Sequence, residues 1–350
     1  MSVAITSRPS RRTALLVGIN YRGTANELNG CYNDVVNVAT YLRTVLGYAP
    51  AAITMLTDGN RGSAFPASVA PTRQNILAGL SALVAGMVAG DEAVFHFSGH
   101  GTLVRDTNGD ELTGLDSCLC PLDYNAPASA GGGIVTDDEI RALLVNRVPR
   151  GARLYVILDC CHNGTGCDMR YKYEDFSLLL RPPSARTAPL WRTQQKAFAN
   201  GKYAETAGEV YMISGCRDEQ TSADAYINNA FAGALTYAVF AILRANQASI
   251  RTYSWSALLR DVRYFMRTNK YDQVPQIMTG QLITPAAAVF PGLAAAKRGV
   301  GGGGSLELGI GSVSVLGGSR GVAVEGPTTT LFEFKPKSGA NTRHAIQFLH

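Results

Sequence analysis

Short apolar runs alternate along the chain with segments whose apolar residues recur at helical spacing. Runs rich in β-branched and aromatic residues predict buried strands over residues 13–20, 51–56, 92–101, 152–161 and 209–216. Periodic segments predict helices over residues 34–47, 71–88, 225–243 and 254–269. Apolar strands that alternate with helices are typical of a mostly parallel sheet covered on both faces. We therefore predict an α/β fold with three layers.

Two of the predicted helices carry further information. Pro71 and Thr72 are start signals for the second helix. The run 225–243 is uncharged and long enough to span a bilayer. Its Asn pair, Gly233 and Thr236 favour a helix in the protein core instead. The predicted helix over residues 71–88 is expected to bury Leu77, Leu80, Leu83, Val84, Met87 and Val88.

Three stretches interrupt the alternation of strands and helices. Clusters of Gly, Asp, Asn and Pro predict long loops over residues 102–138. Residues 166–206 are rich in Arg, Lys, Gln and Pro and read as an exposed linker. After about residue 285 the chain becomes glycine-rich with β-like pieces. The expected organisation is a tail (1–12), a first part (13–165), the linker (166–206), a second part (207–284) and a C-terminal extension of unknown role (285–350).

Composition narrows the class of protein. Of the 350 residues, 17% are charged and the net charge is +5, without a basic run, which argues against nucleic-acid binding. The seven cysteines are an odd number in a long chain and do not resemble a disulfide framework. The N-terminus lacks the apolar core of a signal peptide, although its Ser/Arg-rich composition leaves organelle targeting open. We therefore expect an intracellular, cytoplasmic protein in a reducing compartment, without membrane association.

Candidate chemistry gathers where the third, fourth and fifth predicted strands end, the fifth of them at SGCRDEQTSAD. His100 lies between two glycines after the third strand, and Asp159, Cys160, Cys161 and His162 follow the fourth. In a parallel sheet such strand ends meet at one edge, so groups far apart in sequence become neighbours. An imidazole activates a thiol as thiolate and then protonates the leaving amine. This pattern favours a cysteine hydrolase.

Two plainer interpretations remain open from the pattern alone. The cysteines can be small buried hydrophobic residues, and His96, among apolar neighbours, reads as a core histidine. Zinc is the other alternative, although the ligand spacing fits a zinc site poorly. The residues that would hold zinc are Cys118, Cys120, Cys160 and His162.

The motifs HFSGHGT, LDCCHNGTG and SGCRDEQTSAD together resemble the metacaspases, caspase-like cysteine peptidases of clan CD. LLVGINY, LNGCYNDV and LDSCLCPLDY match the same family, and the resemblance covers roughly residues 13–280. It implies a caspase-like α/β/α sandwich with p20-like and p10-like parts, closest to the type I arrangement without a long prodomain. By this resemblance the catalytic residues are His100 and Cys161, and not Cys160. Asn163 departs from the family, which commonly has Ser there.

The resemblance also implies cleavage after Arg or Lys, with acidic residues in the S1 pocket. The matching residues are Asp34 and Asp159, with Ser214 and Asp224 as a third wall. Paired carboxylates suit a guanidinium or ammonium group. The alternative for Asp34 is a helix N-cap, because it begins an apolar-periodic run.

Many metacaspases need calcium, which prefers several carboxylate ligands. The alternative for this acidic stretch is helix capping, with Thr136 or Asp137 as the N-cap. The residues that match the family's calcium aspartates are Asp137, Asp138 and Asp168, with a fourth that is either Asp123 or Asp116.

A peptidase that cuts after basic residues is expected to cut itself in the exposed linker. We expect protein or peptide substrates and a monomeric enzyme. The rival hypotheses are another clan CD peptidase with a different P1 preference, and a caspase-fold pseudoenzyme that acts as a scaffold. The self-cleavage candidates are Arg181, Arg186, Arg192, Lys196 and Lys202.

Overall fold

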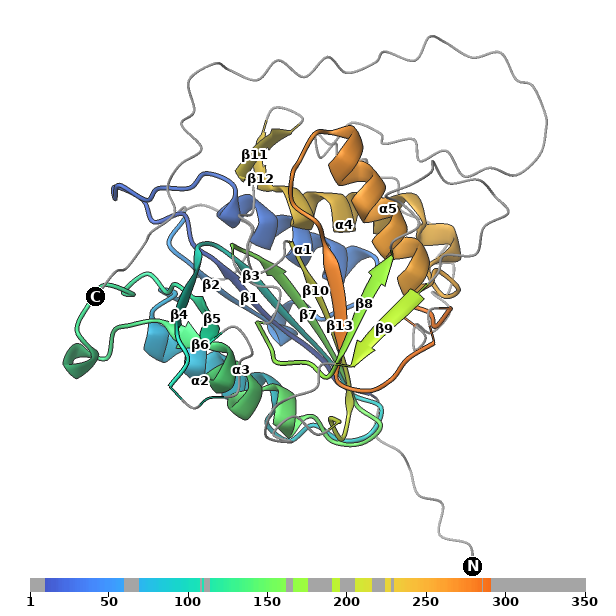
Figure 1. Ribbon diagram of the computed structural model, residues 1–350, viewed down its shortest axis with the longest axis horizontal. Helices are drawn as coiled ribbons and strands as arrows, with labels where there is room; N and C mark the ends of the chain where they lie inside the picture. The colour runs from blue at the N-terminus through green and yellow to red at the C-terminus, as the bar shows by residue number, and fades with distance from the viewer. Residues whose placement is uncertain are drawn as a thin grey trace, which may run out of the picture.

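A large sheet with helices on both faces forms the body of the protein (Figure 1). The computed structural model describes residues 10–59, 69–107, 109, 114–161, 166–175, 191–195, 205–215, 224–227, 230–284 and 286–290. Within these residues the main sheet has eight strands in the order β2-β1-β3-β7-β10-β13-β8-β9. The predicted α/β fold is confirmed.

The predicted apolar runs form the parallel half of this sheet. All four pairings from β2 to β10 are parallel, whereas β13, β8 and β9 add antiparallel pairs. The strands are β1 (Arg12–Gly18), β2 (Ile53–Thr57), β3 (Glu92–Ser98), β7 (Arg153–Asp159), β8 (Tyr171–Asp175), β9 (Trp191–Gln195), β10 (Glu209–Ser214) and β13 (Gln276–Thr279).

The helices cover the sheet in two layers. One apolar cluster joins α1 (Cys31–Thr44), α4 (Ala234–Ala245) and α5 (Trp255–Thr268) to one face. A second cluster joins α2 (Arg73–Val84) and α3 (Asp137–Leu143) to the other face. Successive strand residues alternate between the layers, as Leu15 and Leu16 of β1 do. Burial on both faces explains why these strands are apolar throughout.

Residues 102–138, expected as long loops, contain regular structure. A three-stranded antiparallel sheet lies here, and only its first residue, Gly101, precedes the range. Its strands are β4 (Gly101–Arg105), β5 (Leu115–Leu119) and β6 (Val135–Thr136), and α3 begins directly after β6. The loop prediction was wrong here because Gly, Asp and Asn mark the turns between short strands as readily as they mark long loops.

The exposed-linker prediction was wrong for residues 166–175. Cys167, Asp168, Met169, Tyr171 and Tyr173 are buried, and β8 pairs with β13 inside the main sheet. Further along, β9 pairs with β8. β9 is the edge strand of the sheet, and one of its sides lacks a neighbouring strand. Polar residues are compatible with such an edge strand.

The single helix predicted over 225–243 is also wrong in its first half. Residues there form a hairpin of β11 (Asp224–Ile227) and β12 (Ala230–Gly233), and α4 starts only at Ala234. The Asn pair between two short β-like runs is a hairpin signal that helical periodicity obscured. No helix in the described part of the chain is long and apolar enough to cross a membrane.

The second predicted helix is shorter than expected. It ends at Val84. Val88, which was expected in the buried face, is exposed, and Ile76, which was not expected there, is buried. The glycine-rich extension lies outside the described residues from residue 291 onward. Before that point, Val289 and Phe290 pack into the core with α5.

Candidate active site

The pairing of β3 with β7 brings the predicted catalytic residues together. These strands run parallel, and Ser98 pairs with Asp159 at their carboxyl ends. His100 and Cys161 each follow two residues beyond that pair, at the same edge of the sheet. The Gly99 N–H donates to the Asp159 carbonyl oxygen at 3.3 Å and holds the two strand ends together.

Gly101 allows the histidine turn to approach the cysteine turn closely. A Cβ atom at this position would overlap the Cys161 carbonyl oxygen and lie 3.3 Å from Cys160 Sγ. Cys160 is buried, whereas Cys161 is partly exposed. A nucleophile must be reachable by its substrate, so the geometry favours Cys161 over Cys160.

The His100 ring is oriented by a backbone carbonyl group. Its Nε2 lies 2.8 Å from the Asn26 oxygen. A carbonyl oxygen only accepts hydrogen bonds, so Nε2 carries the proton and Nδ1 keeps the lone pair. Burial lowers the pKa of His100, and the bond to Asn26 offsets part of that effect. The imidazole is therefore neutral near pH 7 and able to accept a proton.

Tyr21 supports the same turn and was missed in the sequence. Its hydroxyl accepts the His100 backbone N–H at 2.9 Å and donates to the Cys120 carbonyl oxygen at 2.5 Å. Its ring lies against the imidazole, with 4.7 Å between the ring centroids. A φ of 51° is rare for a bulky residue and marks Tyr21 as constrained. Its place just after an apolar run was the signal available.

Asp34 lies in the first turn of α1 and points to the neighbouring strand ends. Ser98 donates to its Oδ2 at 2.6 Å, and the Gly233 N–H reaches both carboxylate oxygens at 2.9 and 3.1 Å. The N-cap position of α1 is Gly30, without a side-chain cap. The N-cap interpretation of Asp34 was therefore wrong.

Asp159 is the second carboxylate at this place. Its Oδ2 accepts the Thr236 N–H at 2.8 Å. A Cβ atom on Gly233 would overlap that oxygen and lie 2.8 Å from Asp34 Oδ2. The two carboxylates therefore flank Gly233, and they are only 0% and 4% exposed. Backbone N–H donors at the start of α4 satisfy these buried carboxylate oxygens.

The two residues predicted as a third wall lie near this acidic pair. Ser214 ends β10, and its buried hydroxyl has no hydrogen-bond partner among the described residues. Asp224 pairs through its backbone with Gly233 in the β11–β12 hairpin. The main chain of Asp224 thus lies beside the residue that separates the two carboxylates.

His96 is a core residue, as expected. It is 0% exposed, and its Nε2 lies 3.1 Å from Thr236 Oγ1. Burial lowers the pKa of His96 to about 3, so the ring is neutral across the physiological range.

Two of the predicted calcium residues, Asp137 and Asp123, accept backbone hydrogen bonds in this structure. Asp137 accepts the backbone N–H groups of Ser117 and Asp138 at 2.8 and 3.0 Å. Asp123 accepts the Arg73 N–H at 2.7 Å. Among the described residues, no three His, Cys, Asp or Glu side chains converge to hold a metal. The three cysteines of the zinc alternative do not converge either. Its fourth residue, His162, lies outside the described residues.

The remaining candidates of this set are distributed around α3. Asp116 and Asp168 are buried, and Asp168 also has a φ of 48°. Asp168 and Asp137 both raise the pKa of the Cys167 thiol, after its burial. These two acidic side chains therefore act on the same buried thiol.

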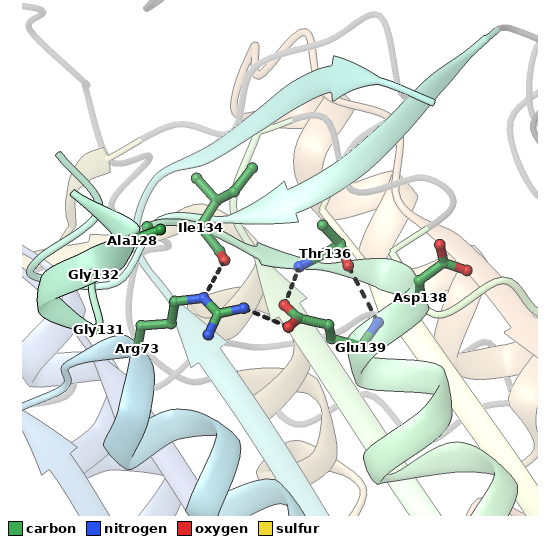
Figure 2. A pocket seen from close by; sticks show the side chains of 9 residues that line it. Arg73, Ala128, Gly131, Gly132, Ile134, Thr136, Asp138 and Glu139 are labelled. Carbon is green, nitrogen blue, oxygen red and sulfur yellow. Dashed lines mark hydrogen bonds and ion pairs between the residues drawn. The ribbon is translucent and has the colours of Figure 1, made fainter. Parts of the chain in front are cut away.

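Asp138 borders a cavity of about 570 Å³ beside α3. Figure 2 shows Arg73 of α2 bonded there to Glu139 and to the Ile134 carbonyl oxygen. Thr136 is the N-cap of α3 and forms a capping box with Glu139. The capping interpretation of this stretch is confirmed for Thr136, and it does not involve Asp138.

Of the self-cleavage candidates, the structure describes one. Arg192 lies in β9 and pairs with Glu174 of β8, at the edge of the main sheet. It is therefore part of a strand and not of an irregular linker. Arg181, Arg186, Lys196 and Lys202 lie outside the described residues.

A mostly parallel sheet with a histidine turn and a cysteine turn at adjacent strand ends defines a caspase-like cysteine peptidase. The sequence profile of the metacaspase, peptidase C14 domain matches residues 12–170. Metacaspase-1 of Mycosarcoma maydis is 35% identical over 306 residues, which are 79% of this chain and 72% of that protein. The chain belongs to the metacaspase family, whose members are cysteine-type peptidases.

A second metacaspase agrees with this assignment, and a solved structure is similar in fold. Metacaspase-1 of Yarrowia lipolytica is 34% identical over 295 residues, which are 76% of this chain and 61% of that protein. The chain therefore spans about three fifths of that relative. A solved structure of a protein from Geobacter sulfurreducens is similar, with a TM-score of 0.51 and 25% sequence identity. The match covers 79% of this chain and 96% of the Geobacter chain.

Proposed function

We propose that this chain is a cysteine endopeptidase that cleaves proteins after Arg or Lys, with Cys161 as nucleophile and His100 as general base and acid. The observation that carries the proposal is the β3–β7 pairing, because it joins His100 and Cys161 to the acidic pair of Asp34 and Asp159. Protein substrates follow from membership of a peptidase family.

The proposed mechanism uses the lone pair on His100 Nδ1. The imidazole takes the proton of the Cys161 thiol, and the thiolate attacks the carbonyl carbon of the scissile bond. When the carbon–nitrogen bond breaks, the imidazolium returns that proton to the leaving amine. His100 then takes a proton from water, and the hydroxide attacks the thioester carbonyl carbon and breaks the carbon–sulfur bond. The imidazolium returns its proton to the departing Cys161 thiolate, which restores the thiol.

The proposed P1 preference rests on the acidic pair. Two carboxylates in a site almost closed to water attract a cation more strongly than exposed ones would. Their fixed N–H donors, from Gly233 and Thr236, keep the oxygens in place before substrate binds. An Asp side chain at P1 would meet like charges and be rejected.

Calcium activation is a separate part of the proposal. It is supported by the concentration of buried acidic residues around α3, of which Asp137 and Asp168 are two. No catalytic step is assigned to calcium. We further propose self-cleavage at basic residues between 176 and 204.

The proposed setting is a reducing, intracellular compartment, in which the enzyme acts as a monomer. The reducing compartment is supported by the cysteines, because the six that the structure describes are not assigned to disulfide bonds. They are Cys31, Cys118, Cys120, Cys160, Cys161 and Cys167.

A peptide series tests these proposals. The full chain is incubated with fluorogenic peptides that carry Arg, Lys, Asp or Asn at P1, with millimolar calcium or with a chelator. Cys161→Ala is the test variant, and Cys160→Ala is the matched control because that thiol is the buried neighbour. We expect calcium-dependent cleavage after Arg and Lys that Cys161→Ala abolishes and Cys160→Ala retains.

The outcomes separate the parts of the proposal. Cleavage after Asp or Asn would refute the role of the acidic pair and leave the catalytic pair in place. Equal rates with calcium and chelator would refute calcium activation alone. A folded wild-type chain that cleaves no peptide would support the scaffold hypothesis. Fragmentation of the Cys161→Ala chain under the same conditions would contradict self-cleavage.

A further inference from the structure

His96 and Thr236 form a hydrogen-bonded pair behind the acidic pair. Nε2 of His96 lies 3.1 Å from Oγ1 of Thr236, and both residues are almost fully buried. His96 is on β3, four residues before His100, whereas Thr236 is in the first turn of α4. The bond therefore ties the start of α4 to the strand that carries the catalytic histidine.

Thr236 forms hydrogen bonds with both Asp159 and His96. Its backbone N–H donates to Asp159 Oδ2 at 2.8 Å, and its hydroxyl bonds to His96. The position of that N–H, and of the carboxylate it holds, thus depends on a bond to β3. The same turn begins at Gly233, whose N–H holds Asp34.

Neutral His96 is suited to orientation and not to proton transfer. Burial keeps its pKa near 3, so the ring carries no charge at the pH at which a thiolate forms. A neutral imidazole offers one donor and one acceptor, either of which can pair with a hydroxyl group. Its bond to Thr236 therefore persists across the working range of the enzyme.

We propose that His96 and Thr236 are positioning residues for the basic P1 side chain, acting through the carboxylate of Asp159. The proposal rests on the proposed preference for Arg and Lys. A guanidinium binds a carboxylate through two parallel hydrogen bonds, so it is sensitive to rotation of that carboxylate. An ammonium group is a point charge and tolerates such rotation. Loosening Asp159 should therefore weaken binding of Arg more than binding of Lys.

Steady-state kinetics on the full chain test this role. Thr236→Val removes the hydroxyl group and keeps the backbone N–H, and Thr236→Ser restores the hydroxyl. Thr268→Val on α5 is the matched control, because its hydroxyl bonds to the carbonyls of Tyr264 and Phe265 at an exposed site. The probes are paired peptides with Arg or Lys at P1, and thermal melting confirms that each variant is folded.

We expect Thr236→Val to raise KM for the Arg peptide about 10-fold, which is about 1.4 kcal/mol. KM for the Lys peptide should change less, and kcat should stay within about twofold for both. Thr236→Ser and Thr268→Val should resemble wild type. His96→Leu should reproduce the effect, and the double variant should add little to it, because both changes remove one bond.

Unchanged KM in folded Thr236→Val would overturn the proposal, as would an equal loss for both peptides or a loss confined to kcat. If Thr236→Val does not fold, His96→Leu decides by the same criteria, and a second unfolded variant would show a structural role and overturn the proposal. Wild-type protein that cleaves neither peptide would refute the proposed function itself and the positioning role with it.

Discussion

The imidazole of His100 is held on two sides, by the Asn26 carbonyl oxygen and by the Tyr21 ring, and the Tyr21 hydroxyl accepts the His100 backbone N–H. Neither neighbour takes part in the proposed chemistry. Both restrict the ring to the orientation in which Nδ1 keeps its lone pair. At the scale of single residues, the site thus depends on supports whose side chains perform no reaction.

Tyr21→Phe should lower kcat about 10-fold and leave KM for an Arg peptide nearly unchanged. The variant keeps the ring contact and loses the hydroxyl that joins the His100 N–H to the Cys120 carbonyl oxygen. Single-turnover and steady-state rates would measure this. Tyr264→Phe on the exposed face of α5 is the control. A wild-type kcat in folded Tyr21→Phe would contradict the role of Tyr21.

His96 should make the protein less stable in acid. Its pKa is about 3 in the fold and about 6.5 in the unfolded chain, so between these values the unfolded state binds more protons. Its contribution to stability is complete above about pH 6.5 and is lost as the pH falls toward 3, by about 1.4 kcal/mol per unit. Urea unfolding of wild type and His96→Leu at several pH values should show a shallower pH dependence in the variant. Parallel curves would contradict this prediction.

At the scale of elements, the backbone N–H groups at the helix starts find their acceptors in two ways. Thr72, Thr136 and Ser254 each accept a backbone N–H from the first turn of their helix. The start of α4 differs, because its N–H groups are held by Asp34 and Asp159 from other elements. A helix start thereby becomes part of the candidate site.

Ser254→Ala should destabilise the protein by about 1 kcal/mol, because the Ala257 N–H at the start of α5 loses its acceptor. The free energy of unfolding in urea would measure the loss. Ser249→Ala is the control, since its exposed hydroxyl bonds only a nearby turn carbonyl, that of Asn246. Equal stability of the Ser254→Ala and Ser249→Ala proteins would contradict the prediction.

At the scale of the whole molecule, one sheet joins the two parts of the chain. β10 of the second part pairs with β7 of the first, and β8, which precedes the cleavage region, pairs with β13. The core cluster under α4 and α5 also contains residues of α1 and β1. A cut between residues 176 and 204 therefore breaks the backbone without separating these contacts.

A chain cleaved in this region should migrate as two fragments on a denaturing gel and elute as one species in gel filtration. The physical reason is the buried sheet pairing and apolar core that both fragments share. Uncut Cys161→Ala protein supplies the reference elution volume. Fragments that elute separately would contradict this prediction.

Local pattern predicted the parallel strands, α1 and α5. It failed where local signals are ambiguous, as in the β11–β12 hairpin, and where pairing partners are distant in sequence, as for β8 and β13. Tyr21 and Thr236 were not recognised as part of the site, because their hydrogen-bond partners are about 80 to 140 residues away.

The class of fold could be inferred from short segments of the chain, because apolar periodicity is a local property, and residue chemistry in the same segments indicated His100 and Cys161 as candidate reactive groups. Only the tertiary structure decided which nitrogen of His100 keeps its lone pair, that Asp34 faces Gly233 and is not an N-cap, and that His96 supports α4. These features depend on directional hydrogen bonds between distant segments, and such bonds are established only when the sheet has assembled its strands side by side.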